Sequence, residues 1–129
     1  IMALHPNIEY LHIGADEVYH IGECSRCLEE LAKKQWTKRQ LFLSHIKKVT
    51  SYIKHKYPKV KILMWDDEFR DITPSEIMET GLNKVVEPVV WKYTRNPGSS
   101  LSEQLWEGYA ETWGEVWVAT AFKGATDPD

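Results

Sequence analysis

The sequence predicts an α/β fold built on a parallel sheet. Four short apolar runs rich in β-branched residues recur along the 129 residues, and polar residues and then helical periodicity follow the first three of them. Repeated strand–helix units favour parallel strands, because each helical crossover returns the chain to the same end of the sheet. The runs are nearly continuously apolar, as in sheets buried on both faces. The predicted strands are residues 8–14, 60–65, 85–91 and 116–122.

The connection between the first two strands is predicted to hold two helices. Over residues 37–57, apolar side chains recur at helical spacing. Thr37 with Gln40 three residues later is a capping-box signature, and Pro58 marks the end of this helix. A shorter helix over residues 25–34 fills the start of the connection.

A third helix is predicted after the second strand. Thr73 stands at a cap position, Pro74 at the first helical position, and Glu76 where its side chain can return a hydrogen bond. Gly81 is expected to end this helix.

The predictions for the second half of the chain rest on single residues. Ser100 with Glu103 predicts the start of a fourth helix, which Gly114 ends. Pro88 lies inside the third strand and has no N–H to donate. We therefore expect a bulge or a locally broken ladder at Pro88.

The distribution of polar residues favours a (β/α)8 TIM barrel over an open doubly wound sheet. Polar residues follow the carboxyl ends of all four strands, and no glycine-rich phosphate loop follows any of them. A complete barrel needs about 200 residues or more. Residues 1–129 are therefore expected to be one partial barrel, a fragment with about four βα units.

Composition excludes several classes of function. A net charge of −3 gives no electrostatic case for binding nucleic acid or an anionic membrane, and no run is long enough to span a membrane. The first residues show no basic-then-apolar run, so a secretory leader is not expected. Cys24 and Cys27 predict two reduced thiols of an intracellular protein; the alternative is half of a zinc site, completed by His20.

The end of the first strand carries the most informative stretch, residues 12–17 (HIGADE). Gly14 and Ala15 would let a substrate approach the backbone, and Asp16 and Glu17 follow side by side. The alternative is a solvated loop in which the acids cap the next helix.

These residues resemble a known signature. The pattern His-x-Gly-x-Asp-Glu is similar to that of glycoside hydrolase family twenty, the β-N-acetylhexosaminidases. Further motifs, at residues 65–67, 87–93 and 121–126, follow in the right order and resemble one branch of that family. The resemblance runs from about Tyr10 to Thr126 and implies that the four strands are strands four to seven of a catalytic barrel.

The resemblance implies a retaining mechanism that the substrate assists. Glu17 would protonate the glycosidic oxygen and later act as base toward water, and Asp16 would orient the 2-acetamido group that attacks the anomeric carbon. An ordinary retaining enzyme instead needs a second carboxylate about 5–5.5 Å away across the sugar. The fourth strand ends without a carboxylate, which independently favours a nucleophile supplied by the substrate.

The resemblance also implies the walls of a sugar pocket. Tyr93 is the candidate donor to the acetamido oxygen. For Trp65 the alternative is a place in the core, and for the two aspartates a helix cap. The candidate substrate-binding residues are Trp65, Asp66, Asp67, Trp91 and His12.

The expected substrate is a glycan with a terminal β-linked GlcNAc or GalNAc, cleaved without metal or cofactor. Two alternatives stay open. One is a two-carboxylate glycosidase that pairs Glu17 with Asp67, Glu68 or a residue outside this segment, and the other is a non-catalytic carbohydrate- or protein-binding module. The resemblance and the reduced thiols favour a cytoplasmic or nuclear location. A homodimer of the full-length protein is a further hypothesis.

Overall fold

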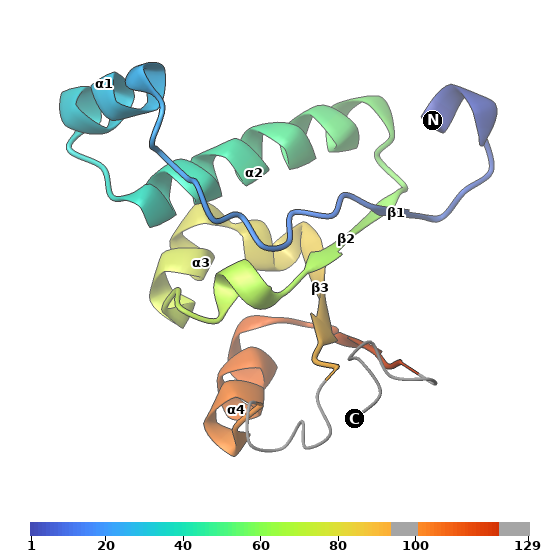
Figure 1. Ribbon diagram of the computed structural model, residues 1–129. Helices are drawn as coiled ribbons and strands as arrows, with labels where there is room; N and C mark the ends of the chain where they lie inside the picture. Colours follow the sequence, from blue (N-terminus) through green and yellow to red (C-terminus); the bar gives the residue numbers. More distant parts are fainter. Residues whose placement is uncertain (94–100, 122–129) are drawn as a thin grey trace, which may run out of the picture.

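The computed structural model describes residues 1–93 and 101–121, and it contains a parallel sheet of four strands. The order of the strands across the sheet is β1-β2-β3-β4, the same as their order along the chain (Figure 1). The predicted α/β class with a parallel sheet is therefore confirmed. The strands are β1 (Tyr10–His12), β2 (Lys61–Trp65), β3 (Val86–Trp91) and β4 (Trp117–Ala119).

The sequential strand order is compatible with a segment of a barrel. A doubly wound sheet has a switch point at which the strand order reverses, and these four strands contain none. All three neighbouring pairs are parallel, so the carboxyl ends of the four strands lie at one edge of the sheet.

Helices connect the strands much as their cap residues predict. The threonine at position 37 accepts a hydrogen bond from the Gln40 N–H at 3.2 Å, and Thr73 makes the same kind of capping box with Glu76. Gly81 ends the third helix with φ at 76°, a left-handed conformation that glycine adopts without strain. The helices are α1 (Ser25–Lys34), α2 (Lys38–Lys56), α3 (Pro74–Thr80) and α4 (Glu103–Thr112), with short 3₁₀ turns η1 (Met2–Leu4), η2 (Asp67–Phe69) and η3 (Leu82–Lys84).

The predicted ends of the fourth helix are wrong. Ser102, not Ser100, caps α4, because its extended backbone places the hydroxyl 3.2 Å from the Leu105 N–H. The helix ends at Thr112, before Gly114, because the backbone of Trp113 is already extended.

The expected bulge at Pro88 is also wrong, since β3 pairs with β2 in unbroken register through Met64 and Pro88. The neighbouring Val89 carbonyl accepts a hydrogen bond from Asp66 on the β2 side. Backbone groups of successive strand residues face opposite neighbours, so the Pro88 nitrogen faces β4. Pairing with β4 begins only at Val89, and the missing N–H therefore interrupts no ladder bond.

The strand β1 is shorter than the predicted range of 8–14, but its backbone pairing with β2 covers nearly all of that range. The Lys61 N–H donates to the Glu9 carbonyl, and the Trp65 N–H donates to the Gly14 carbonyl. Main-chain hydrogen bonds to β2 thus extend from Glu9 to Gly14. The end of the predicted fourth strand, at Phe122, lies outside the described residues.

Helices α2, α3 and α4 pack on one face of the sheet and form a single core with it. In Figure 1, α2, α3 and α4 follow one another along one side of the strands. Ile62 and Met64 from β2 and Val90 from β3 are fully buried in this core. No helix of the described part is long and apolar enough to cross a membrane. The helices contribute Phe42, Leu43, Ile46, Ile77 and Tyr109, and Trp113 joins them from just after α4.

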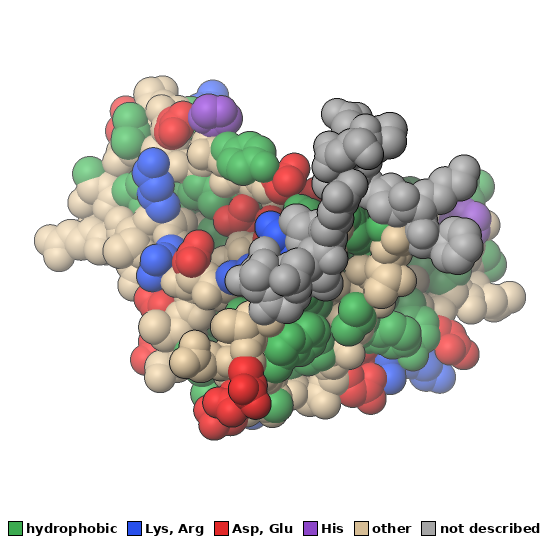
Figure 2. All heavy atoms as spheres, turned by 60° about the horizontal axis from the view of Figure 1, so that its bottom comes forward, with side chains coloured by type: hydrophobic (Ala, Val, Ile, Leu, Met, Phe, Trp, Pro, Cys, Tyr) green, Lys and Arg blue, Asp and Glu red, His purple; other side chains and the backbone are tan. Residues whose placement is uncertain are grey.

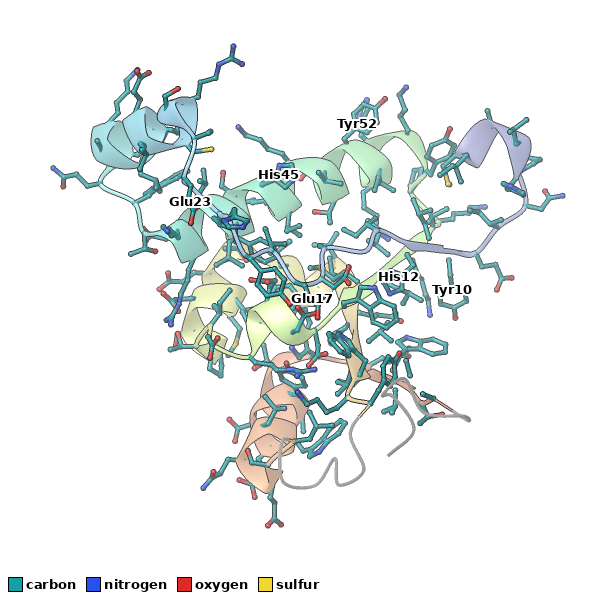
Figure 3. The ribbon with its side chains drawn as sticks, viewed as in Figure 1. Tyr10, His12, Glu17, Glu23, His45 and Tyr52 are labelled. Atoms are coloured by element: carbon teal, nitrogen blue, oxygen red, sulfur yellow. The ribbon has the colours of Figure 1, made fainter. Side chains whose placement is uncertain are left out.

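The opposite face of the sheet carries alternate residues, many of them aromatic. Tyr10 and His12 point to the same side of β1 (Figure 3). Tyr10 meets the ring of Trp117 edge-on at 5.6 Å, and the Trp117 indole N–H donates to Glu87 at 2.7 Å. Tyr10 and Trp117 are each 39% exposed. Hydrophobic side chains also gather on the face turned forward in Figure 2, with charged side chains at their margin.

Candidate active site at the carboxyl ends of the strands

Asp16 and Glu17 lie on the loop that follows β1, and both are exposed. This loop has a left-handed backbone at three positions, with φ of 77° at Gly14, 67° at Ala15 and 47° at Glu17. Glycine adopts such angles freely, whereas at Ala15 and Glu17 they carry a steric cost. Surrounding contacts must therefore hold the loop in this shape.

Two acidic side chains after β2 supply those contacts. Asp67 accepts a hydrogen bond from the Glu17 N–H at 2.7 Å, and Glu68 accepts one from the Val18 N–H at 2.8 Å. Burial raises the pKa of Glu68 from its ordinary value. Asp67 uses its other oxygen to accept from the Trp91 indole N–H at 3.0 Å. One carboxylate thus connects the loop after β1 with the end of β3.

His12 supports the loop from its beginning. Its Nδ1 accepts a hydrogen bond from the Gly14 N–H at 3.0 Å, which requires that nitrogen to be unprotonated. Burial lowers the pKa of His12, against the opposing effect of Asp16. The neutral ring also lies 4.5 Å from the ring of Trp65.

An aromatic row crosses the sheet at this edge. From the ring of His12 the row passes to Trp65, whose ring lies 6.5 Å from Trp91. The Trp91 ring lies 5.6 Å from that of Tyr93. Four of the predicted site residues, from three different strand ends, therefore come together in one row of contacts. We refer to His12, Trp65, Trp91 and Tyr93 as the aromatic row.

We expected Asp66 to bind the sugar, but its side chain is fully buried and cannot reach a ligand. Its two carboxylate oxygens bind the Arg70 guanidinium at 2.8 Å each, and one of them also accepts from the Tyr109 hydroxyl at 2.9 Å. Arg70 also donates to the Trp91 carbonyl at 2.7 Å. Asp66 therefore anchors η2 to β3 and α4, and in the described structure no part of it faces solvent.

Sequence reasoning missed several residues around the site. One of them is Tyr19, whose pKa is raised by desolvation and then by its interaction with the Glu17 carboxylate. Arg70 stands four residues after Asp66, a spacing that could have indicated the pair. Tyr109 packs in the core, and its bond to Asp66 joins residues 43 positions apart, a pairing for which the sequence has no local signal.

The remaining expectations concern the cysteines and the last motif. Cys24 caps α1, since its Sγ accepts from the Cys27 N–H at 3.3 Å, and His20 pairs with Glu23 instead. Over residues 1–93 and 101–121, no three His, Cys, Asp or Glu side chains are grouped to hold a metal ion. Of the motif at residues 121–126, everything after Ala121 lies outside the described residues.

The parallel sheet and the residues at the carboxyl ends of its strands are compatible with part of a barrel enzyme. Barrel enzymes collect their active-site residues from loops at the carboxyl ends of several parallel strands. Here paired acids follow one strand, and an aromatic row continues across the next two.

Comparison with known proteins gives a particular relative. The chain is 38% identical to human hexosaminidase D over 129 residues, which is 99% of this chain and 26% of that protein. It is 36% identical to bovine hexosaminidase D, covering 98% of this chain and 37% of the relative. The chain thus spans between about a quarter and somewhat over a third of these relatives. No family model matches it. The resemblance seen in the motifs is confirmed as a similarity to hexosaminidase D along nearly the whole chain.

Proposed function

We propose that this chain is part of the catalytic barrel of a β-N-acetylhexosaminidase, corresponding to strands four to seven. The complete protein would release terminal β-linked N-acetylhexosamine from the non-reducing end of a glycan in the cytoplasm or nucleus. Similarity to hexosaminidase D supports this proposal. The observation that carries it is the position of Asp16 and Glu17, on a strained loop beside the aromatic row.

In the proposed reaction Glu17 is the general acid and then the general base. It gives its proton to the glycosidic oxygen as the bond to the anomeric carbon breaks. The carbonyl oxygen of the substrate's own 2-acetamido group attacks that carbon, and a cyclic oxazolinium ion forms. Glu17, now a carboxylate, takes a proton from water, and the water opens the ring from the opposite face. Two inversions at one carbon give net retention.

Asp16 would position the acetamido group and stabilise its developing positive charge. An anion next to the acetamide nitrogen favours the cyclised ion over the open substrate, so this contribution is made mainly in the transition state. Hydrolysis by this route needs neither a metal nor a cofactor.

The aromatic row would form the wall of the sugar pocket. The rings of Trp65 and Trp91 would pack against the acetamido methyl group, and the Tyr93 hydroxyl would donate to the acetamido oxygen. His12 would act from behind, through its contact with Trp65. We now propose Asp66 as an anchor rather than a sugar ligand, because its side chain has no exposed surface.

The test uses the full-length protein and aryl β-glycosides of GlcNAc and GalNAc. We expect cleavage of these substrates, inhibition by a thiazoline mimic of the cyclised sugar, and no cleavage of a glucoside that lacks the acetamido group. Glu17→Gln should lower kcat by about 10²–10⁴-fold, the usual contribution of a general acid. Glu23→Gln is the matched control, since Glu23 lies nearby and pairs only with His20 among the described contacts.

Different outcomes would reject the proposal. Full activity on the glucoside, or no effect of the thiazoline, would exclude assistance by the substrate. A covalent sugar trapped on Asp67 or Glu68 would instead establish the two-carboxylate alternative.

A further inference from the structure

Among the acidic residues of the described site, only Asp67 bonds both to the loop after β1 and to β3. Its Oδ2 holds the Glu17 N–H at 2.7 Å, and its Oδ1 holds the Trp91 indole N–H at 3.0 Å. Glu68, the next residue, bonds to the same loop through Val18 and makes no contact of this kind with β3. Asp67 therefore bridges two elements, whereas Glu68 supports only one.

We propose that Asp67 is a positioning residue that fixes the backbone of Glu17 relative to the Trp91 ring. Its catalytic consequence rests on the proposed function, in which Glu17 moves the proton and Trp91 lines the sugar pocket. Asp67 would set the distance between the acid and the wall, without touching the sugar.

The backbone angle of Glu17 supports this role. A φ of 47° is disfavoured for a residue with a side chain, so Glu17 would relax without an external restraint. The bond to Asp67 is short and charge-assisted, and bonds of this kind are among the strongest that a backbone N–H makes. Loss of this bond should let the loop move while leaving the chemical groups of Glu17 intact.

The bond between Asp67 and the Trp91 indole also affects alignment, because it holds the Trp91 ring in place. Trp91 contacts both Trp65 and Tyr93, so the indole bond orients the centre of the aromatic row. A direct sugar ligand would behave differently, because its loss weakens substrate binding and raises KM. A positioning residue acts on alignment in the transition state, and its loss lowers kcat.

The decisive variant is Asp67→Asn in the full-length protein. The amide keeps the shape of the carboxylate, but its nitrogen cannot accept a hydrogen bond, so one of the two bonds is lost. We expect kcat to fall by about 10–100-fold, the scale of small misplacements, with KM changed less than about threefold. Asp71→Asn is the matched control, being the same substitution at an exposed site four residues on.

A double-mutant cycle tests the bridge itself. Trp91→Phe removes the indole N–H and keeps an aromatic ring. If Asp67 acts through Trp91, the losses in kcat are not additive, and Asp67→Asn costs less when combined with Trp91→Phe than in wild type. Additive losses, or a rise in KM without a loss of kcat for Asp67→Asn, would overturn the proposal.

An NMR measurement separates this inference from the proposed function. The indole N–H resonance of Trp91 and the backbone amide resonance of Glu17 should both move in Asp67→Asn and stay in place in Asp71→Asn. If the wild-type protein does not cleave N-acetylhexosaminides, the proposed function fails, yet the two resonances still report the bridge. If the enzyme is active and neither resonance moves, the inference alone fails.

Discussion

The buried carboxylate of Asp66 connects the segments that support the candidate site. Its carboxylate is fully buried, and Arg70 and Tyr109 satisfy it from two different elements. A buried charge is tolerated only when it is paired and hydrogen-bonded, and removal of one partner leaves the other uncompensated.

Asp66→Asn should therefore destabilise the protein strongly. The amide cannot neutralise Arg70, whose side chain is only 19% exposed, and we expect a loss of about 3 kcal/mol in the free energy of unfolding. Urea denaturation of the full-length protein measures this loss, with Asp71→Asn as the exposed control. Equal stability of the two variants would show that the buried pair contributes little.

The lowered pKa of His12 predicts that the stability of the protein depends on pH. Burial lowers the pKa of His12 below the ordinary value of 6.5, so the unfolded chain takes up a proton at a higher pH than the folded protein does. The stabilising contribution of His12 is complete above that value and is lost as the pH falls below it. Melting temperatures of wild type and His12→Asn, recorded from neutral to mildly acidic pH, should converge toward lower pH. Parallel curves would contradict this account.

The sequence indicated which residues lie together at the candidate site, but not the contacts that hold them there. The acids and aromatic residues were recognisable because they follow strand ends in a familiar spacing. The bridging role of Asp67 was not predictable, since the bond partners Glu17 and Trp91 lie 50 and 24 positions away. The same holds for the left-handed backbone of Glu17, which long-range contacts hold in place.

At the scale of elements, local signals predicted the helices where one cap residue was available. Thr37 and Thr73 were each correctly identified, because each has a partner three residues on and no competing serine or threonine just before the helix. Before α4, Ser100 fits the capping-box pattern with Glu103, whereas Ser102 has Leu105 three residues on, so the pattern indicated the wrong serine. The extended backbone of Ser102 and its bond to the Leu105 N–H make it the cap. Pro88 misled the strand prediction, because sequence alone does not reveal which neighbour its nitrogen faces.

The capping box at the start of α2 predicts a measurable contribution of Thr37 to the stability of the protein. Thr37→Ala removes the acceptor for the Gln40 N–H and should cost about 1 kcal/mol of stability, whereas Thr37→Ser retains the hydroxyl and should cost much less. Chemical denaturation of the full-length protein distinguishes the two. An equal loss in both variants would assign the effect to the threonine methyl group instead of the cap.

At the scale of the whole molecule, helices of the described residues cover one face of the sheet, and none of them covers the other. The repeated βα units made the parallel order predictable, because a right-handed crossover leaves little choice of topology. What covers the second face was not predictable from these residues. In a complete barrel the remaining strands would enclose it.

Residues 1–129 produced alone should therefore fold poorly. The second face exposes aromatic side chains such as Tyr10 and Trp117. In the described part of the chain, β1 and β4 are the outer strands of the sheet, and outer strands can pair with other chains. We expect binding of a hydrophobic dye, self-association and no sharp melting transition, each compared with the full-length protein. A monomeric segment that melts cooperatively would contradict this expectation.

In the proposed reaction, the substrate's acetamido oxygen is the nucleophile while Glu17 moves the proton. The most direct test is kcat/KM of the full-length protein for aryl glycosides whose N-acetyl group carries zero to three fluorine atoms. Fluorine withdraws electrons from the attacking oxygen, so the account predicts that kcat/KM falls steeply with each fluorine added. A kcat/KM value that does not change with fluorination would contradict it.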